Sequence, residues 1–224
     1  MEMTIWQFLA IWFVIFIIYS FGGWVIEVLV TIINHKKLVN RGFLIGPVCP
    51  IYGVGALLLS LICSCSDGVI EIFCVSMIGS ALLEYLTSWW MEMAFHVRWW
   101  DYSEQPFNLN GRICVGSVLR FGLAGVLILK VINPFLLWLV GLLPILAVEI
   151  IALVLLIIML ADIAVSTYLI IAYKVTVDTA GRDATEEISE RIREILRGKS
   201  KLQQHHYKAF PGQAPSKRSA KPKK

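Results

Sequence analysis

Ionisable residues are concentrated in two consecutive apolar segments and in the polar loop between them. Glu84 and Glu92 lie in the segment before the loop, and Arg112 and Arg120 lie in the segment after it. An ion in membrane hydrocarbon is costly unless it is paired or hydrated. These four residues therefore need partners, and we expect the functional site in this stretch.

The spacing of these charges predicts two ion pairs. Glu92 and Arg112 lie equally far from Tyr102 in the sequence, and so do Glu84 and Arg120. In a symmetric antiparallel hairpin the members of each pair would lie at the same depth, with about 12 Å of helix between the two pairs. Each arginine can hold a carboxylate with two parallel hydrogen bonds. Such pairs either line a substrate path or only hold the fold together.

The loop between the segments supplies further candidates. Arg98 and Asp101 flank two tryptophans, and Asn108 precedes Asn110. These residues could line a vestibule that binds a solute. Alternatively, the aromatic residues form a belt at the membrane surface, and the asparagines are turn residues before a helix.

Glu27 is a candidate from an earlier apolar segment. We expect it to face protein or water near Gly46–Gly53, where two prolines and two glycines break the helix and leave backbone N–H groups available. The alternative is that Glu27 extends to the aqueous surface. The complete set of predicted substrate-binding residues is Glu27, Arg41, Glu84, Glu92, Arg98, Asp101, Asn108, Arg112 and Arg120.

Motifs for nucleotide hydrolysis, metal binding and nucleophilic catalysis are absent. The sequence has no G-x-x-x-x-G-K-[ST], H-E-x-x-H, G-x-S-x-G or C-x-x-C. The five cysteines lie in or beside apolar segments, where they are expected to be small buried hydrophobic residues. We therefore predict no catalytic residue, no metal site and no cofactor, so the chain is not expected to be an enzyme.

Composition places these residues in a membrane. The 224 residues are 58% hydrophobic and 16% charged, which fits an integral membrane protein and not a soluble domain. Of the 20 Lys and Arg residues, 13 follow Tyr173. The basic tail lacks elements that read or stack bases, so we expect membrane lipid, and no nucleic acid, as its partner.

The apolar pattern predicts an all-α integral membrane protein with about five transmembrane helices. The region Pro134–Leu143 is predicted to be a short interfacial or re-entrant helix, because Pro134 and Gly141 lie within it and Pro144 follows it. The transmembrane domain covers residues 1–173. The expected spans are Ile5–Ile33, Leu44–Cys63, Val69–Phe95, Arg112–Ile132 and Pro144–Tyr173.

The C-terminal region is expected in the cytoplasm. Residues 174–198 contain a capping box, Asp183 to Glu186, followed by an apolar stripe at helical spacing. This amphipathic helix, 183–197, lies against the membrane or docks a partner subunit. Residues 199–224 are predicted to be a disordered basic tail. Basic residues gather on the cytoplasmic side of a membrane, so five spans place the N-terminus outside.

Three ordered motifs carry a resemblance to a known family. They cover roughly Ile5 to Gly125 and resemble the bacterial family of type IV ABC-transporter permeases, or CmpB-like proteins. The resemblance implies a multi-pass subunit of the cell membrane whose energy comes from a separate cytoplasmic ATPase. The motifs are Tyr19-Ser-Phe-Gly-Gly-Trp-Val-Ile-Glu27, the stretch from Asn40 to Gly55, and the stretch from Arg98 to Ile113.

Three functions therefore remain open at the level of sequence. The first is the permease component of an ABC-type transporter. The second is a membrane-embedded structural, regulatory or lipid-binding protein. The third is a membrane enzyme that uses Glu84 or Glu92 with Asp101 for proton transfer, and the missing motifs disfavour it.

Overall fold

The computed structural model describes residues 3–36, 40, 42–64, 66–95 and 98–172, and they are mostly helical. The predicted helix 183–197 and the predicted tail 199–224 lie outside the described residues. A small two-stranded sheet stands in the loop before α4. The elements are α1 (Ile5–His35), α2 (Pro50–Ile62), α3 (Val69–Phe95), β1 (Asn108–Leu109), β2 (Ile113–Cys114), α4 (Val115–Leu127), η1 (Ile128–Ile132), α5 (Asn133–Gly141) and α6 (Ile145–Ala172).

Four helical stretches of the described chain are long and apolar enough to cross a membrane. This confirms the prediction of a multi-pass membrane protein. The remaining predicted span, Leu44–Cys63, is only partly helical, because α2 has 13 residues, or about 20 Å, against a hydrocarbon core of about 30 Å. The four stretches are Ile5–Ile33, Val69–Phe95, Val115–Gly141 and Ile145–Tyr168.

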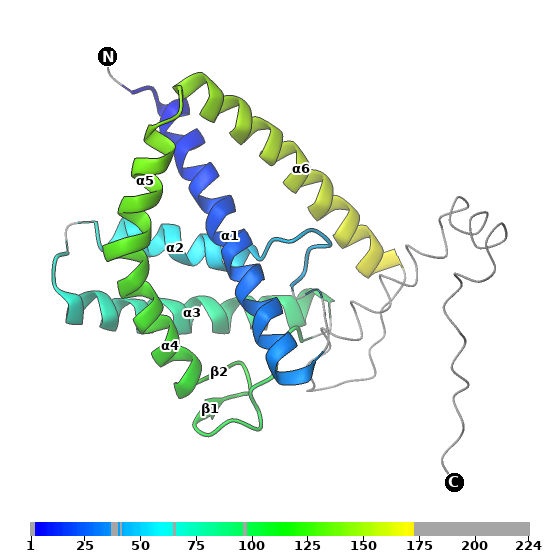
Figure 1. The fold of residues 1–224 in the computed structure, drawn as a ribbon. Helices are drawn as coiled ribbons and strands as arrows, with labels where there is room; N and C mark the ends of the chain where they lie inside the picture. Colours follow the sequence, from blue (N-terminus) through cyan, green and yellow to red (C-terminus); the bar gives the residue numbers. More distant parts are fainter. Residues whose placement is uncertain (1–2, 37–39, 41, 65, 96–97, 173–224) are drawn as a thin grey trace, which may run out of the picture.

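The region predicted as a separate interfacial or re-entrant helix continues the preceding span instead. Figure 1 shows α5 following α4 without a break, and η1 joins them as a π-helical turn. The backbone N–H of Asn133 bonds to the carbonyl of Ile128, five residues back. Pro134 has no N–H to donate and crowds the preceding turn, and the wider π turn just before it accommodates both effects.

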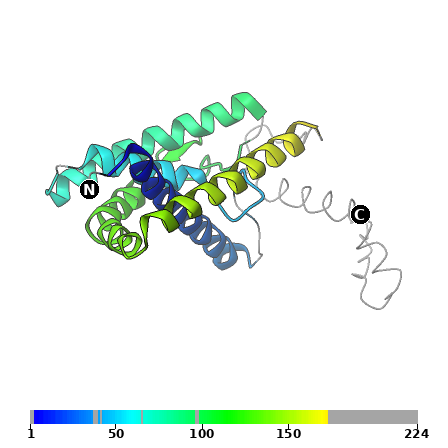
Figure 2. The ribbon, with the colours of Figure 1, turned by 90° about the horizontal axis from the view of Figure 1, so that it is seen from above.

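The apolar core surrounds the N-terminal half of α1. Figure 1 shows α6 starting beside the first turns of α1, and Figure 2 shows it passing across α1. Ile15 of α1 and Val148 of α6 are almost completely buried in this core. The other buried members of the cluster come from α1, α2, α5 and α6 and are Val14, Tyr19, Ala56, Leu136, Val140 and Ala152.

Close packing of small residues sets the crossing of α3 and α4. A Cβ atom on Gly122 would lie 2.5 Å from Met77, and a Cβ on Gly125 would collide with Ser76. The two backbones therefore approach closely here, as small residues allow between membrane helices. In Figure 1, α4 crosses α3 at a steep angle, so the pair is not the symmetric hairpin that the charge spacing predicted.

Candidate functional site

A tight turn folds the loop between α3 and α4. Asn110 and Gly111 both have positive φ, 54° and 68°, and the N–H of Arg112 bonds to the carbonyl of Leu109 at 3.0 Å. Asn-Gly is the typical pair for a turn with two positive φ values between antiparallel strands. Here it joins β1 to β2 and turns the chain back toward α4.

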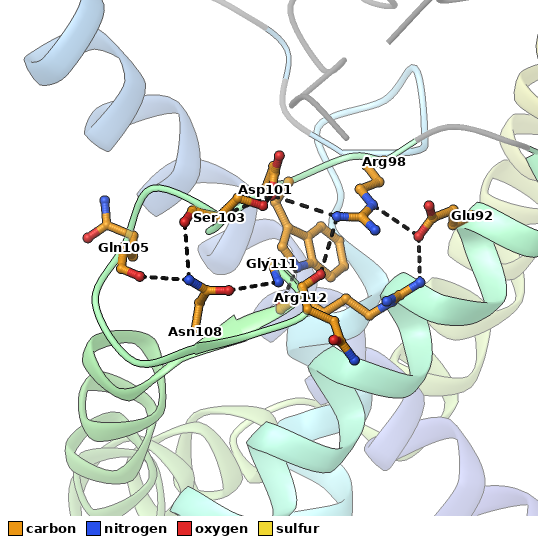
Figure 3. A network of polar contacts seen from close by, with 10 residues as sticks. Glu92, Arg98, Asp101, Ser103, Gln105, Asn108, Gly111 and Arg112 are labelled. Atoms are coloured by element: carbon orange, nitrogen blue, oxygen red, sulfur yellow. Dashed lines mark hydrogen bonds and ion pairs between the residues drawn. The ribbon is translucent and has the colours of Figure 1, made fainter. Parts of the chain in front are cut away.

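Asn108 holds the rest of the loop from inside, as Figure 3 shows. Its side-chain NH₂ donates to the carbonyls of Ser103 and Gln105, at 3.1 and 2.9 Å. Its side-chain oxygen accepts from the N–H of Gly111 at 3.0 Å. The predicted candidate Asn108 therefore spends its hydrogen bonds on the loop backbone.

Glu92 joins the loop to the end of α3. One carboxylate oxygen, Oε2, accepts from Arg112 at 2.6 Å and from Arg98 at 3.0 Å. The predicted Glu92–Arg112 pair is confirmed, and Arg98 is an additional partner. Arg98 also lies 3.8 Å from Asp101. Two acids and two bases thus balance in the loop network, which we define as Glu92, Arg98, Asp101, Asn108 and Arg112 (Figure 3).

Glu84 lies deeper in the bundle and is 6% exposed. The hydroxyl of Tyr102 donates to its Oε1 at 3.0 Å, and the hydroxyl of Ser117 lies 3.3 Å from its Oε2. The predicted ion pair of Glu84 with Arg120 is wrong, since no ion pair joins these two described residues. The steep crossing of α3 and α4 brings Ser117 to the carboxylate and leaves Arg120 exposed.

Glu27 of α1 faces α2. The hydroxyl of Tyr52 donates to Glu27 Oε1, so the prediction that Glu27 faces protein near Gly46–Gly53 is confirmed. The contact described for it here is with a phenol. Gly23 makes room for the Tyr52 ring, which also lies 6.1 Å from the ring of Phe121 on α4.

Tyr102 hydrogen-bonds to Glu84 and also lies within electrostatic range of Glu27. Burial raises the pKa of Tyr102 above its ordinary value, and the nearby negative charges of Glu84 and, more weakly, Glu27 raise it further. The phenol therefore remains a hydrogen-bond donor at neutral pH. We call Glu27, Tyr52, Glu84, Tyr102 and Ser117 the carboxyl–tyrosine cluster; it draws on α1, α2, α3, α4 and the loop.

Asp162 is a polar residue of the interior that the predicted site does not include. Its two carboxylate oxygens accept from the backbone N–H groups of Ile45 and Gly46, at 3.1 and 2.9 Å. The signal in the sequence is an acid in an otherwise apolar segment, which needs partners in hydrocarbon. Sequence spacing does not reveal that the partner is backbone more than 100 residues away.

Of the predicted site residues, Arg41 lies outside the described residues. Within the described part of the chain, no group of three or more His, Cys, Asp and Glu is placed to hold a metal ion.

The fold and the site together define a class: a multi-pass helical membrane protein with ionisable groups in its interior. The chain belongs to the family described as Putative ABC-transporter type IV, whose model matches residues 14–167. The match extends beyond Gly125, where the resemblance in sequence motifs ends, and includes most of α6. A search of curated proteins and a search of solved structures each returned no match.

Proposed function

We propose that this chain is the permease subunit of an ABC-type transporter and depends on a separate ATPase. Family membership supports a transport-related membrane protein. The observation that carries the proposal is the carboxyl–tyrosine cluster, where side chains from four helices and the loop surround two carboxylates, of which Glu84 is buried.

Within this proposal the polar residues have two different roles. The charges of the loop network are paired within it, so Glu92, Arg98 and Arg112 hold the loop over the end of the bundle. Glu84 instead accepts hydrogen bonds only from hydroxyl groups, and no cation lies within ion-pair distance of it among the described residues. A hydroxyl can reorient easily, so Glu84 is the group that we expect to contact a solute with a positive charge or N–H and O–H donors.

The ATPase partner would bind on the cytoplasmic side. We propose that the helix 183–197 docks it. The basic residues Lys36, Lys37 and Arg41, between the first two predicted spans, and the basic tail support a cytoplasmic C-terminus. The N-terminus is then outside if α2 and the segment before it complete a fifth crossing. We propose no enzymatic step for this chain itself.

Copurification from native membranes tests the partner. Mass spectrometry should identify an ATPase subunit with the full chain, and a chain cut after Lys174 should lose it. Recovery of the full chain with lipid alone, and with no nucleotide-hydrolysing protein, would contradict the proposal.

Transport in reconstituted vesicles that contain the copurified complex tests the cluster. Replacing Glu84 with Gln should reduce solute movement while ATPase copurification persists. Glu104→Gln is the matched control, because Glu104 is an exposed loop carboxylate. Equal transport by both variants would remove Glu84 from the solute path.

A structural, regulatory or lipid-binding role is the second candidate. The loop network favours this second role, because its charged side chains pair with one another and need no ligand. Under this alternative, variants of Glu84 would change only the stability of the protein, and lipid would copurify with it.

A further inference from the structure

The segment 42–49 is non-helical chain between α1 and α2. Inside a membrane protein, such backbone is tolerated only where protein or water satisfies its polar groups. The N–H of Cys49 bonds to the carbonyl of Ser20 on α1 at 2.9 Å. The carbonyls of Leu44 and Ile45 accept from the side chain of Asn40, at 3.3 and 2.9 Å.

Two residues of α6 hold the middle of this segment. Asp162 accepts from the N–H groups of Ile45 and Gly46, and Ser166 accepts from Ile45 at 3.1 Å. Ser166 also donates to Asp162 at 3.0 Å. The fit is close, since a Cβ atom on Gly46 would lie 2.6 Å from a carboxylate oxygen of Asp162.

The segment connects this contact to the carboxyl–tyrosine cluster. Its Phe43 packs against Phe95 at the end of α3 and against Trp99 of the loop, with ring centroids 5.2 and 5.8 Å apart. Its last residues lead directly into α2, where Tyr52 binds Glu27. A displacement of the segment would therefore disturb both the loop and one carboxyl–tyrosine pair.

The C-terminal half of α6 has few other attachments in the described structure. Of the four candidate spans, α6 is the least buried, with 11% of its apolar window inside. Its buried core residues, Val148 and Ala152, lie in its first half. In Figure 1, α1 and α6 are close at the start of α6, and the far end of α6 lies away from α1.

We propose that Asp162 and Ser166 form a latch that holds the segment 42–49 closed, and that its release opens access to the carboxyl–tyrosine cluster. The role of this access in transport rests on the function proposed above. The latch consists of hydrogen bonds that water can replace, so it can open without loss of the apolar core. Because α6 leads directly into the C-terminal region, a movement of that region by a partner would act on the latch.

The sulfur of Cys49 reports the state of the latch. Cys49 is 6% exposed, and its Sγ is packed within the segment, 2.9 Å from where a Cβ of Gly42 would be. In detergent, modification by N-ethylmaleimide can be followed for each cysteine by peptide mass spectrometry, with the exposed Cys74 as internal reference.

Two variants should open the latch from opposite sides. Asp162→Ala removes the acceptor, and Gly46→Ala displaces the carboxylate without altering a charge. Both should raise the modification rate of Cys49 relative to Cys74 at least about tenfold, which corresponds to about 1.4 kcal/mol. Glu149→Ala, on the same helix, is the matched control and should leave the rate unchanged.

An unchanged rate for Cys49 in the folded variants would overturn the latch. If Asp162→Ala does not fold, Gly46→Ala decides the question alone. This measurement needs no transport and is therefore independent of the proposed function.

A cross-link then tests whether the latch must open. A disulfide between cysteines introduced at Ile45 and Ser166, whose N–H and hydroxyl are 3.1 Å apart, would hold the latch closed, and mass spectrometry verifies that the disulfide has formed. The oxidised variant should bind its ATPase but not transport, and reduction should restore transport. Undiminished transport by the cross-linked protein would refute an opening latch, whereas absence of transport in the wild type would refute only the proposed function.

Discussion

Removing the Glu92 carboxylate should destabilise the protein, because two guanidinium groups depend on one of its oxygens. The arginine side chains are only 15% and 13% exposed, whereas that of Glu92 is 32% exposed. A hydrogen bond to a charged group contributes about 1.5–3 kcal/mol. Because Glu92 is partly exposed, water can partly replace its hydrogen bonds to Arg98 and Arg112. We therefore expect Glu92→Ala to cost about 2–3 kcal/mol, between a surface pair and a fully buried one.

Thermal unfolding in detergent measures this loss. For a chain of this size, about 2–3 kcal/mol corresponds to a fall in Tm of about 4–12 °C. The double variant Glu92→Ala with Arg112→Met removes one cation together with its acceptor, so it should lose less than the sum of the single changes, by about 0.5–3 kcal/mol. Glu104→Ala, at an exposed loop position, should shift Tm by no more than about 2 °C. Equal effects of Glu92→Ala and Glu104→Ala, or strict additivity in the double variant, would refute the reasoning.

Three further predictions concern the loop, the helix crossing and the topology. Tyr102→Phe should remove a stabilisation that is constant below about pH 10, the pKa of an unfolded tyrosine. Above that pH the stabilisation should shrink, because the pKa of Tyr102 is raised in the folded state and the unfolded state loses its proton first. Tm profiles of both proteins from pH 7 to 11 check this. Gly125→Ala should cost about 1–3 kcal/mol because its Cβ meets Ser76, whereas Gly79→Ala, with nothing within 4 Å, should not destabilise; thermal unfolding compares them. A reporter fused after Lys224 that works only outside the cell should be inactive, and activity would disprove a cytoplasmic C-terminus.

Local patterns predicted what depends on neighbours in the sequence. The apolar stretches gave three of the helices to within a few residues, including Val69–Phe95. The Glu92–Arg112 pair could be predicted because both residues lie close to the loop, where the chain must turn back whatever angle the helices adopt. The hairpin β1–β2 was missed, although Asn110-Gly111 is the signal that could have found it.

Contacts that depend on helix packing could not be predicted in this way. The prediction of the Glu84–Arg120 pair assumed that residues equally far from Tyr102 in the sequence lie at equal depth in the membrane. This holds only if the axes of the two helices are nearly antiparallel. Gly122 and Gly125 bring α4 across α3 instead, and Glu84 takes hydroxyl donors from Ser117 and Tyr102. Glu27 was correctly placed near the start of α2, where Tyr52 donates to it, but the sequence did not reveal that the N–H of Gly46 bonds to Asp162.

Three acids of the described chain, Glu84, Glu92 and Asp162, differ in what satisfies them, and this difference is the basis of the solute contact that we propose for Glu84. Glu92 has two guanidinium partners and Asp162 has two backbone N–H groups, so both are compensated by groups fixed in the fold. Glu84, although more buried than Glu92, has only two hydroxyl donors, and a neutral donor offsets less of the cost of a buried charge than a cation does. Arg120, one turn beyond Ser117, acts on Glu84 only through weaker, longer-range attraction and forms no ion pair with it. Because the fold leaves Glu84 to hydroxyl groups, we propose Glu84, and not Glu92 or Asp162, as the carboxylate that contacts a solute.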